Sequence, residues 1–235
     1  MVRVDTVYQR VLALANKEQR GYITPQEFNL HANQAQMNIF EQYFYDTHQF
    51  QAVQKGNSTE YSDMIDLLAE KIAPFEKHKI AVSMSGNTGT LAEDLYRLGT
   101  VFFAVGGTKD VEVERVEKNY FAYIENSPLA APTEKRPVYT RVSNTTIKTF
   151  PSATITSNVT HNYVAKPTKV EWAYVVVNEK ALFNANNAVH FELHPSEEES
   201  LVINILELAG ITINKAGLAQ TAANMDQKNI QQEKQ

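Results

Sequence analysis

The spacing of apolar residues divides the chain into a region with a helical period and a region with a strand period. Up to about residue 75, apolar positions recur every three or four residues, as they do along the buried face of a helix. A first helix is expected to begin at Asp5 or Thr6 and to extend through Ala15. Another helix is expected to begin at Ser58 and to stop before Pro74.

The helix between these two has the clearest start signal in the chain. Thr24 is the expected N-cap, Pro25 the first helical residue and Glu27 the acidic partner of a capping box. The apolar stripe of this helix is expected to contain Phe28, Ala32, Ala35, Ile39 and Tyr43. The pattern continues to about residue 51, so we expect a long helix.

Between about residues 76 and 195 the apolar period changes to two, which is typical of strands. Strands are expected at 80–82, 100–105, 139–142, 145–150 and 169–177. Both faces of the last one carry apolar residues, which predicts a strand that is covered on each side. One helix is expected to interrupt the strands at about 112–126, because its apolar residues recur at helical spacing.

A short C-terminal helix is expected after Pro195. Ser196 and Glu199 have the spacing of a second capping box, and a run of glutamates places negative charge at the positive end of the helix dipole. Gly210 is expected to end this helix. The segment 218–235 is rich in Gln, Asn and Lys, and we expect it to order only on binding.

The predicted fold class is α+β, with an N-terminal helical bundle, a mostly antiparallel β domain and a C-terminal helix followed by an extended tail. The expected divisions are a helical lobe at 1–75, a β-rich lobe at 76–195 that contains the inserted helix, a C-terminal helix at 196–217 that returns to the helical lobe, and a polar tail at 218–235.

Composition excludes several kinds of chemistry. The chain has 235 residues and no cysteine, so disulfides, thiolate nucleophiles and cysteine-ligated metals are excluded. With 22 basic and 27 acidic residues its formal net charge is −5, which argues against a surface that grips DNA phosphates throughout. The N-terminal pattern is not that of a signal peptide, and no apolar run approaches the ~20 residues of a membrane span.

One segment between two predicted helices mimics a twelve-residue calcium loop. Asn16, Glu18 and Glu27 occupy ligand positions, and a glycine stands at the turn. Arg20 also occupies a ligand position, where a cation opposes Ca²⁺, so these three are weak metal candidates. The alternative interpretation is a plain connection between helices that is capped by Thr24 and Glu27.

Three further polar residues, His190, Glu192 and His194, would share one face of a strand, as a zinc triad could. No second cluster or water-activating base accompanies them, so polar surface residues are the favoured interpretation. The chain also shows no Ser/His/Asp order and no paired carboxylates, and the segment 83–90 lacks the lysine of a phosphate loop. We therefore expect no enzymatic activity, no catalytic residue and no cofactor.

Interaction chemistry is the strongest remaining signal. The chain has eleven Tyr, eleven Phe and one Trp, and many of these aromatic residues fall on the second predicted helix. The candidates for a subunit interface on that helix are Phe28, Phe40, Tyr43, Phe44, Tyr45 and Phe50. One interpretation is a large helical core, and the other is an apolar surface that packs on a neighbouring subunit.

Several motifs resemble a known family. The segments YQRV at 8–11, NKEQRGYITPQEFN at 16–29, NQAQ at 33–36 and IFEQYFY at 39–45 resemble the N-terminal helical part of virion structural proteins from crAss-like and related tailed phages. The order of later motifs is similar as well, with NSP at 126–128, PVY at 137–139, NYVAKP at 162–167 and FELHPS at 191–196. The resemblance spans nearly the whole chain.

This resemblance implies a ring or portal adaptor protein in the head-to-tail connector. Such proteins pack helices around a central DNA channel, typically as twelve copies, and their C-terminal segments often reach a neighbouring ring or the portal. The implied partners are other copies of the chain, the portal protein, neighbouring tail, ring or fibre proteins, and genomic DNA that passes through the lumen without sequence-specific binding. The implied location is the tail or neck of the virion, after synthesis in the host bacterial cytoplasm, and no membrane is involved.

Two alternatives remain open at this point. The chain could be another virion part, such as a fibre adaptor or a decoration protein, which the copy number per virion would distinguish. It could also be a degenerate EF-hand-like calcium-binding module that uses Asn16 to Glu27, which calorimetry with Ca²⁺ would test.

Overall fold

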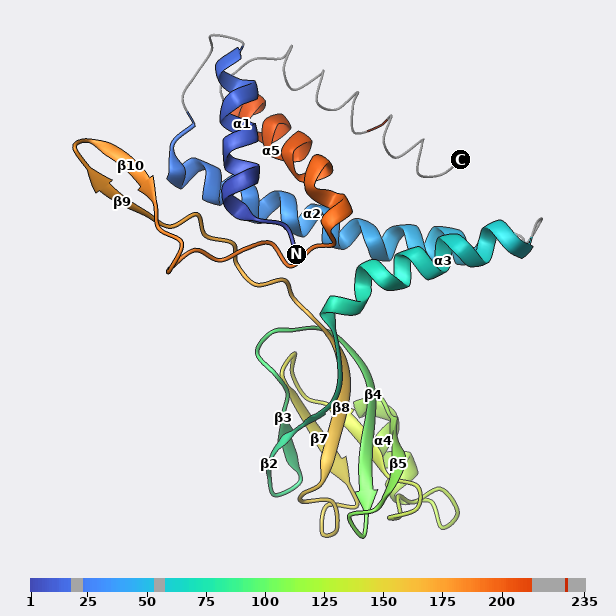
Figure 1. Ribbon diagram of the computed structural model, residues 1–235. Coiled ribbons are helices and arrows are strands. Elements are labelled where there is room, and N and C mark those ends of the chain that lie inside the picture. The colour runs from blue at the N-terminus through green and yellow to red at the C-terminus, as the bar shows by residue number, and fades with distance from the viewer. Residues whose placement is uncertain (18–22, 53–57, 213–226, 228–235) are drawn as a thin grey trace. The chain divides into compact units, whose positions relative to one another are not determined.

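The computed structural model describes residues 1–17, 23–52, 58–212 and 227 (Figure 1). Within these residues the chain contains helices and one large sheet in which almost all neighbouring strands are antiparallel. The predicted α+β class is therefore confirmed. The predicted polar tail at 218–235 lies outside the described residues, apart from residue 227.

The chain divides into two compact units. The helical unit combines Met1–Pro74 with Pro167–Gln235, and the β-rich unit is Phe75–Lys166. The predicted end of the β-rich lobe at residue 195 is wrong, because the chain leaves the sheet after Lys166 and returns to the helical unit. Apolar periodicity alone could not show this return, since an extended segment has the same period wherever it packs.

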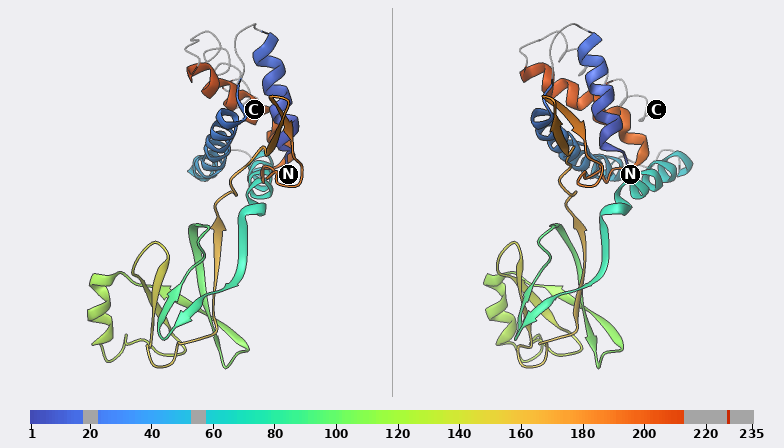
Figure 2. Two further views of the ribbon diagram at one scale, coloured as in Figure 1. Left: turned by 90° about the vertical axis from the view of Figure 1, so that its left-hand side faces the viewer. Right: turned by 60° about the vertical axis from the view of Figure 1, so that its left-hand side comes forward.

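Three helices enclose the core of the helical unit, α1 (Val4–Lys17), α2 (Pro25–Ala52) and α5 (Glu198–Thr212). α5 packs against both α1 and α2, and α3 (Ser58–Ile72) packs against α2 (Figures 1 and 2). The apolar stripes of these helices supply the buried side chains Val4, Val7, Val11, Phe28, Ala32, Ala35, Leu201 and Ile205. Their burial is the main stabilising contribution that these helices receive, since most helical stability in proteins comes from the packing of an apolar face.

The predicted capping box at the start of α2 is confirmed. The Thr24 hydroxyl accepts from the Glu27 N–H at 3.3 Å, and the Glu27 carboxylate accepts from the Thr24 N–H at 3.0 Å. The hydroxyl of Thr24 also donates to this carboxylate at 2.9 Å. These hydrogen bonds from Thr24 hold the pKa of Glu27 below its ordinary value, because they stabilise the charged form.

The start and end of α5 differ from the prediction. A single 3-10 turn at Pro195–Glu197 precedes the helix, and the His194 Nδ1 caps it by accepting from the Ser196 N–H at 3.3 Å. The Ser196 N–H is therefore the donor to a cap that His194 provides, and the predicted capping box of Ser196 with Glu199 is wrong. The helix also continues through Gly210, which was expected to end it.

Glu197, the first residue of the glutamate run, is buried. Its residue is 5% exposed, and its carboxylate lies 2.7 Å from the Nζ of Lys71 on α3. Two charges that leave water depend on each other for compensation. This ion pair connects the first turn of α5 to α3 within the helical unit.

Amide side chains of α2 hold the returning chain in an extended conformation. Asn33 accepts from the Val170 N–H at 2.9 Å and donates to the Val170 carbonyl at 2.9 Å. Asn29 accepts from the Trp172 N–H at 2.8 Å and donates to the Trp172 carbonyl at 3.4 Å. A four-residue step on the helix thus matches a two-residue step along the extended segment.

Gln36 lies next along the same face of α2 and also bonds the returning segment. We call Asn29, Asn33 and Gln36 the amide row. Gln36 is 2% exposed and donates to the Thr168 carbonyl at 2.8 Å. The row supplies the hydrogen bonds that a neighbouring strand would supply. For this reason the predicted strand at 169–177 is present only in its last four residues.

Trp172 fills the space beside α1. It is 4% exposed, its ring centroid lies 4.3 Å from that of Tyr8, and its Nε1 donates to an Asp5 carboxylate oxygen at 3.1 Å. Tyr8 in turn contacts the edge of Phe28 on α2 at 4.7 Å. One aromatic cluster therefore joins α1, α2 and the returning segment.

The β-rich unit is built on an eight-stranded sheet in the order β1-β8-β4-β5-β6-β7-β3-β2. The strands are β1 (Glu76–Ala81), β2 (Ser83–Ser85), β3 (Thr88–Thr90), β4 (Leu95–Val105), β5 (Lys109–Arg115), β6 (Val138–Arg141), β7 (Thr146–Phe150) and β8 (Val159–Ala165). Only Val82 separates the two edge strands β1 and β2, so the sheet rolls until its edges meet (Figure 2). The enclosed core contains Val82, Leu91, Val101, Val113, Tyr139, Ile147, Ile155 and Tyr163.

The predicted helix at 112–126 is only partly present. β5 extends to Arg115, and the helix α4 is limited to Lys118–Glu125. Val113 falls within the predicted helix but lies opposite Val101 of β4 and is 2% exposed. The ladder with β4 decides the conformation here, because pairing partners distant in sequence override a local helical spacing.

A histidine stands in the core of the β-rich unit. His161 of β8 is 1% exposed, and its Nδ1 lies 3.0 Å from the Ile80 carbonyl, so Nδ1 carries the proton in the neutral ring. Its Nε2 has no hydrogen-bond partner within the described residues. The ring stacks on Tyr163 at 4.8 Å, and the Tyr163 hydroxyl donates to Asp94 at 3.0 Å. Burial, together with this hydrogen bond, raises the pKa of Tyr163 to about 12.

The buried His161 predicts that stability falls in mild acid. Burial lowers the pKa of His161, and the Ile80 carbonyl and the Asp94 carboxylate oppose this only in part. The unfolded chain therefore binds the proton at a higher pH, near about 6.5, and the free energy of unfolding falls as the pH decreases from there to the folded pKa. We expect urea denaturation of the β-rich unit to show this fall, with a slope of up to about 1.4 kcal/mol per pH unit.

Two variants test the source of that slope. His161→Phe removes the titrating group but keeps an aromatic ring, so its stability should lose this pH dependence. His78→Gln removes a histidine whose side chain is 71% exposed, and it is the matched control for the loss of a histidine from the same unit. An undiminished slope in His161→Phe would show that another group is responsible.

Candidate subunit interface

The aromatic residues of α2 that were candidates for a subunit interface lie in different environments. Phe28 and Phe40 are fully buried, and Tyr43 is 4% exposed. Side chains that pack inside their own chain are not available to another subunit, so the interface prediction is wrong for these three. These three residues belong to the helical core, which was the alternative interpretation of the sequence.

The other three candidates differ again. Phe44 is half-buried, and its ring contacts Phe40 edge to face at 5.1 Å. The side chain of Phe50 lies outside the described residues. Tyr45 is 62% exposed, so among the candidates with described side chains it is the one at the surface. α2 also exposes Leu30, at 70%.

A hairpin of the helical unit offers a more prominent apolar surface. β9 (Tyr174–Val177) and β10 (Lys180–Phe183) pair with each other and, among the strands that the structure describes, with no other. Asn178 and Glu179 form its two-residue turn, with φ values of 49° and 62°. Positive φ at both positions is typical of a type I′ turn, whose twist matches that of the strands. Figure 1 shows the hairpin extending away from the helices of its unit.

The base of this hairpin is attached to the core of the helical unit. The Trp172 ring stacks on Tyr174 at 5.9 Å and lies 5.7 Å from Phe183. The Asn184 N–H donates to the Ala173 carbonyl at 2.8 Å. Buried contacts at its base therefore set the direction of the hairpin. Towards the turn, its apolar side chains are exposed instead.

Beyond that base, apolar side chains are exposed on both faces of the hairpin. Val175 lies opposite Leu182 on one face, and they are 51% and 53% exposed. Val177 on the same face is 47% exposed, and Val176 on the other face is 63% exposed. The prediction of a strand that is covered on each side is wrong for these valines. An isolated hairpin is marginally stable in water, and exposed apolar patches often mark interaction sites.

The two units also differ in charge. The β-rich unit, Phe75–Lys166, has eleven Lys and Arg against nine Asp and Glu, a formal charge of about +2. The remainder of the chain has eleven basic and eighteen acidic residues, about −7, and the two values together give the −5 of the whole chain. Opposite charges favour contact between unlike units of two copies over contact between like units.

The metal candidates of the predicted calcium loop are not brought together. The carboxylate of Glu27 is occupied by Thr24 in the capping box. Glu18 and the side chain of Asn16 lie outside the described residues. Within the described ranges, no group of three or more His, Asp or Glu side chains is placed to hold a metal ion.

The possible zinc triad also separates into individual structural contacts. His190 Nδ1 accepts from the Val4 N–H at 3.4 Å, and the Glu192 carboxylate accepts from the Thr168 hydroxyl at 2.7 Å and its N–H at 3.0 Å. His194 caps the turn before α5. Each side chain holds a different part of the helical unit, so the predicted triad does not form.

No protein-family model matches this chain, and no curated protein matches it. Among the helices that the structure describes, none is long and apolar enough to cross a membrane.

The hairpin was missed because its sequence signal is weak. Two short apolar runs separated by two residues predict a hairpin when the turn residues favour positive φ. Asn178 is a favourable residue for that conformation, but Glu179 stands where glycine is preferred. Apolar residues on both faces of 169–177 instead predict one long strand that is covered on each side.

Proposed function

We propose that this chain is a structural subunit that assembles with other protein subunits, and that the β9–β10 hairpin inserts into a neighbouring subunit. The observation that supports this most directly is the exposure of three valines and Leu182 on the two faces of a hairpin whose base is fixed. A neighbour that covers both faces would remove this apolar surface from water, which is favourable by roughly 25 cal/mol per Å².

The hairpin is also suited to insertion because of its backbone. Within the described ranges neither strand has a second neighbouring strand, so both outer edges present backbone N–H and C=O groups that no strand there pairs. Open edges of this kind pair with strands of a partner, and the alternating side chains then occupy pockets on it. Apolar contact and backbone pairing would act together in such an interface.

Within this class, we propose a ring of the phage head-to-tail connector or tail, which joins the portal to the tail and surrounds the DNA channel. The resemblance of the motifs at 8–45 and 126–196 supports this form. The unequal charge of the two units is compatible with it, because a ring is built from unlike surfaces that meet at every subunit boundary. Copy number per particle distinguishes a ring from a fibre adaptor.

The test is the mass of the full chain in solution, measured by native mass spectrometry and light scattering at increasing concentration. The chain is measured alone and with the portal protein of the same phage. We expect a closed oligomer, a dodecamer in the ring form, at least when the portal is present. A strict monomer under both conditions would contradict the proposal.

A matched pair of variants tests the hairpin itself. Combining Val175→Thr with Val176→Thr keeps the shape and strand preference of both residues but replaces a methyl group by a hydroxyl on each face. We expect the dissociation constant of the assembly to rise at least about tenfold, with an unchanged melting temperature of the monomer. Val142→Thr makes the same change at a valine of the β-rich unit that is 47% exposed, and it should assemble normally. Equal assembly of both variants would exclude the hairpin as the contact.

A further inference from the structure

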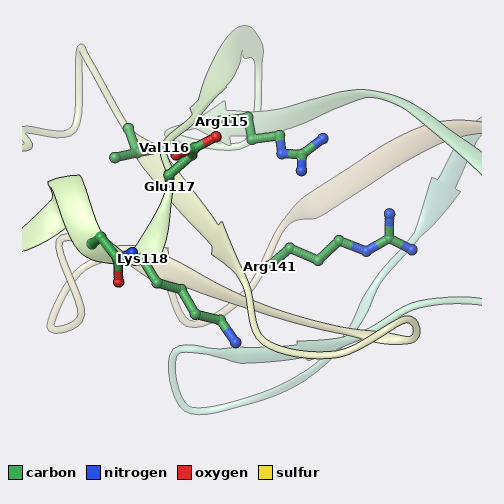
Figure 3. Close-up of a pocket in the computed structure, with 6 residues that line it drawn as sticks. Arg115, Val116, Glu117, Lys118 and Arg141 are labelled. Atoms are coloured by element: carbon green, nitrogen blue, oxygen red, sulfur yellow. The ribbon is translucent and has the colours of Figure 1, made fainter.

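A basic pocket lies at the start of α4 in the β-rich unit (Figure 3). Its volume is about 260 Å³, and its lining consists of Arg115, Val116, Glu117, Lys118, Asn119 and Arg141. Arg115 ends β5, Lys118 begins α4 and Arg141 ends β6, so three elements bring a cation to one cavity. Against these three cations the lining contains one carboxylate, that of Glu117.

Strand pairing places the two arginines on the same face of the sheet. β5 and β6 are parallel, and Arg115 lies opposite Tyr139. Arg141 is two residues beyond Tyr139, so its side chain points to the same face. Burial raises the pKa of Tyr139, and the charges of Arg115 and Arg141 both act in the opposite direction. Figure 3 shows the two arginine side chains extending to one side of the pocket.

Arg141 and Lys118 are held in position by backbone carbonyls but keep donors for a ligand. Arg141 donates from Nε and Nη2 to the carbonyls of the 143–144 turn at 3.1 and 2.8 Å, and Lys118 Nζ donates to the Val142 carbonyl at 2.9 Å. Arg141 Nη1 and two N–H bonds of Lys118 remain available. The side chain of Arg115 has no hydrogen bond or ion pair within the part of the chain that the structure describes.

The first turn of α4 adds backbone donors to the same cavity. Glu117 is the N-cap residue, and its side chain makes no capping hydrogen bond. The first N–H groups bonded within the helix are those of Tyr120 and Phe121, each 3.0 Å from the Glu117 carbonyl. The N–H groups of Lys118 and Asn119 precede them and have no acceptor within the described residues. Unpaired N–H groups at a helix start favour an anion.

We propose that this pocket binds a phosphate group, which the three cations and the two unpaired N–H groups of α4 hold together. A phosphate has oxygens in several directions, so it can accept from β5, α4 and β6 at once, and a guanidinium can bind two of these oxygens. A carboxylate presents two oxygens in one plane and would leave part of this donor set unpaired. The group can be a free phosphate ion or part of a nucleic-acid backbone.

The test is a titration of the full chain followed by amide NMR. Inorganic phosphate should produce saturable shifts of the Lys118 and Asn119 resonances, and acetate at the same ionic strength should not. A fluorescent double-stranded DNA is titrated in parallel by anisotropy. The absence of saturable shifts with phosphate, or an equal response to acetate, would overturn the proposal.

Two variants locate the site. Arg115→Gln should weaken phosphate binding about tenfold without unfolding the unit, because this side chain holds no other group in place. Lys135→Gln removes the same charge from the same unit outside the pocket and should bind as the wild type does. Equal binding by the two variants would overturn the proposal.

The DNA titration identifies the source of the phosphate. If Arg115→Gln weakens DNA binding as well as phosphate binding, the nucleic-acid backbone supplies the phosphate. If Arg115→Gln weakens only phosphate binding, the ligand is the free anion.

Discussion

Replacing Trp172 by Ala is expected to lower the free energy of unfolding of the helical unit by about 3–5 kcal/mol. Trp172 is 4% exposed, and its ring contacts Tyr8 of α1 at 4.3 Å. It also stacks on Tyr174 at the base of the hairpin. The change removes one aromatic side chain from the junction of α1, α2 and the returning segment, and the rigid backbone around it cannot close the cavity.

Urea denaturation followed by far-UV circular dichroism measures this loss, because the chain has no second tryptophan to report by fluorescence. The helical signal should be fitted separately from the β-rich unit, since two units need not unfold together. Trp172→Phe keeps most of the packing but loses the hydrogen bond to Asp5, and we expect a smaller loss of about 1–2 kcal/mol. If Trp172→Ala were as stable as Trp172→Phe, the aromatic cluster would not be a core element.

Replacing Asn33 by Ala is expected to cost about 2–3 kcal/mol, although Asn33 is a polar residue on a helix. Its side chain is the partner of both the N–H and the carbonyl of Val170, each at 2.9 Å. Val170 is 2% exposed, so water cannot replace these hydrogen bonds. The free energy of unfolding falls because the change leaves a buried donor and a buried acceptor of Val170 without hydrogen-bond partners. Gln34→Ala removes an exposed amide from the same helix and should change stability by less than about 0.5 kcal/mol.

A second variant at the same position tests the hydrogen-bond geometry itself. In Asn33→Asp the ionised carboxylate can still accept from the Val170 N–H. It cannot donate to the Val170 carbonyl, so that hydrogen bond is lost. Protonation restores a donor, so the folded state raises the pKa of the new carboxyl. Its stability relative to the wild type should therefore recover as the pH falls from 7 towards about 4 and be lost again as the pH rises. A deficit that does not change with pH would mean that Asn33 acts by shape alone.

Local sequence accounts for much of the helical unit. The capping residues Thr24 and Glu27 and the apolar stripe after them are sufficient to predict where α2 begins and which face it buries, because both depend on contacts within a few residues. The same reasoning could not separate core from interface. Phe28 and Tyr45 have similar chemistry, and the arrangement of α1 and α5 decides that one is buried and the other is 62% exposed.

The candidate sites depend on contacts between distant residues. The amide row lies within the family-like motifs, but its function of holding residues 168–172 appears only when α2 meets the returning chain. The pocket needs Arg115 and Arg141, which are 26 positions apart by their numbers and meet because β5 and β6 are parallel neighbours. No spacing rule in the sequence predicts that parallel pair.

The sequence by itself determined the α+β class, the start and capping box of α2, and the absence of cysteine chemistry, because these follow from composition and from short-range patterns. Tertiary structure decided where the β-rich unit ends, that Glu112 to Arg115 form a strand, and that the valines after Tyr174 face solvent. These properties depend on which neighbouring element bonds the backbone of an extended segment and which element buries its side chains. Extended segments have the same period in a sheet, beside a helix or in an exposed hairpin, so only the fold distinguishes them.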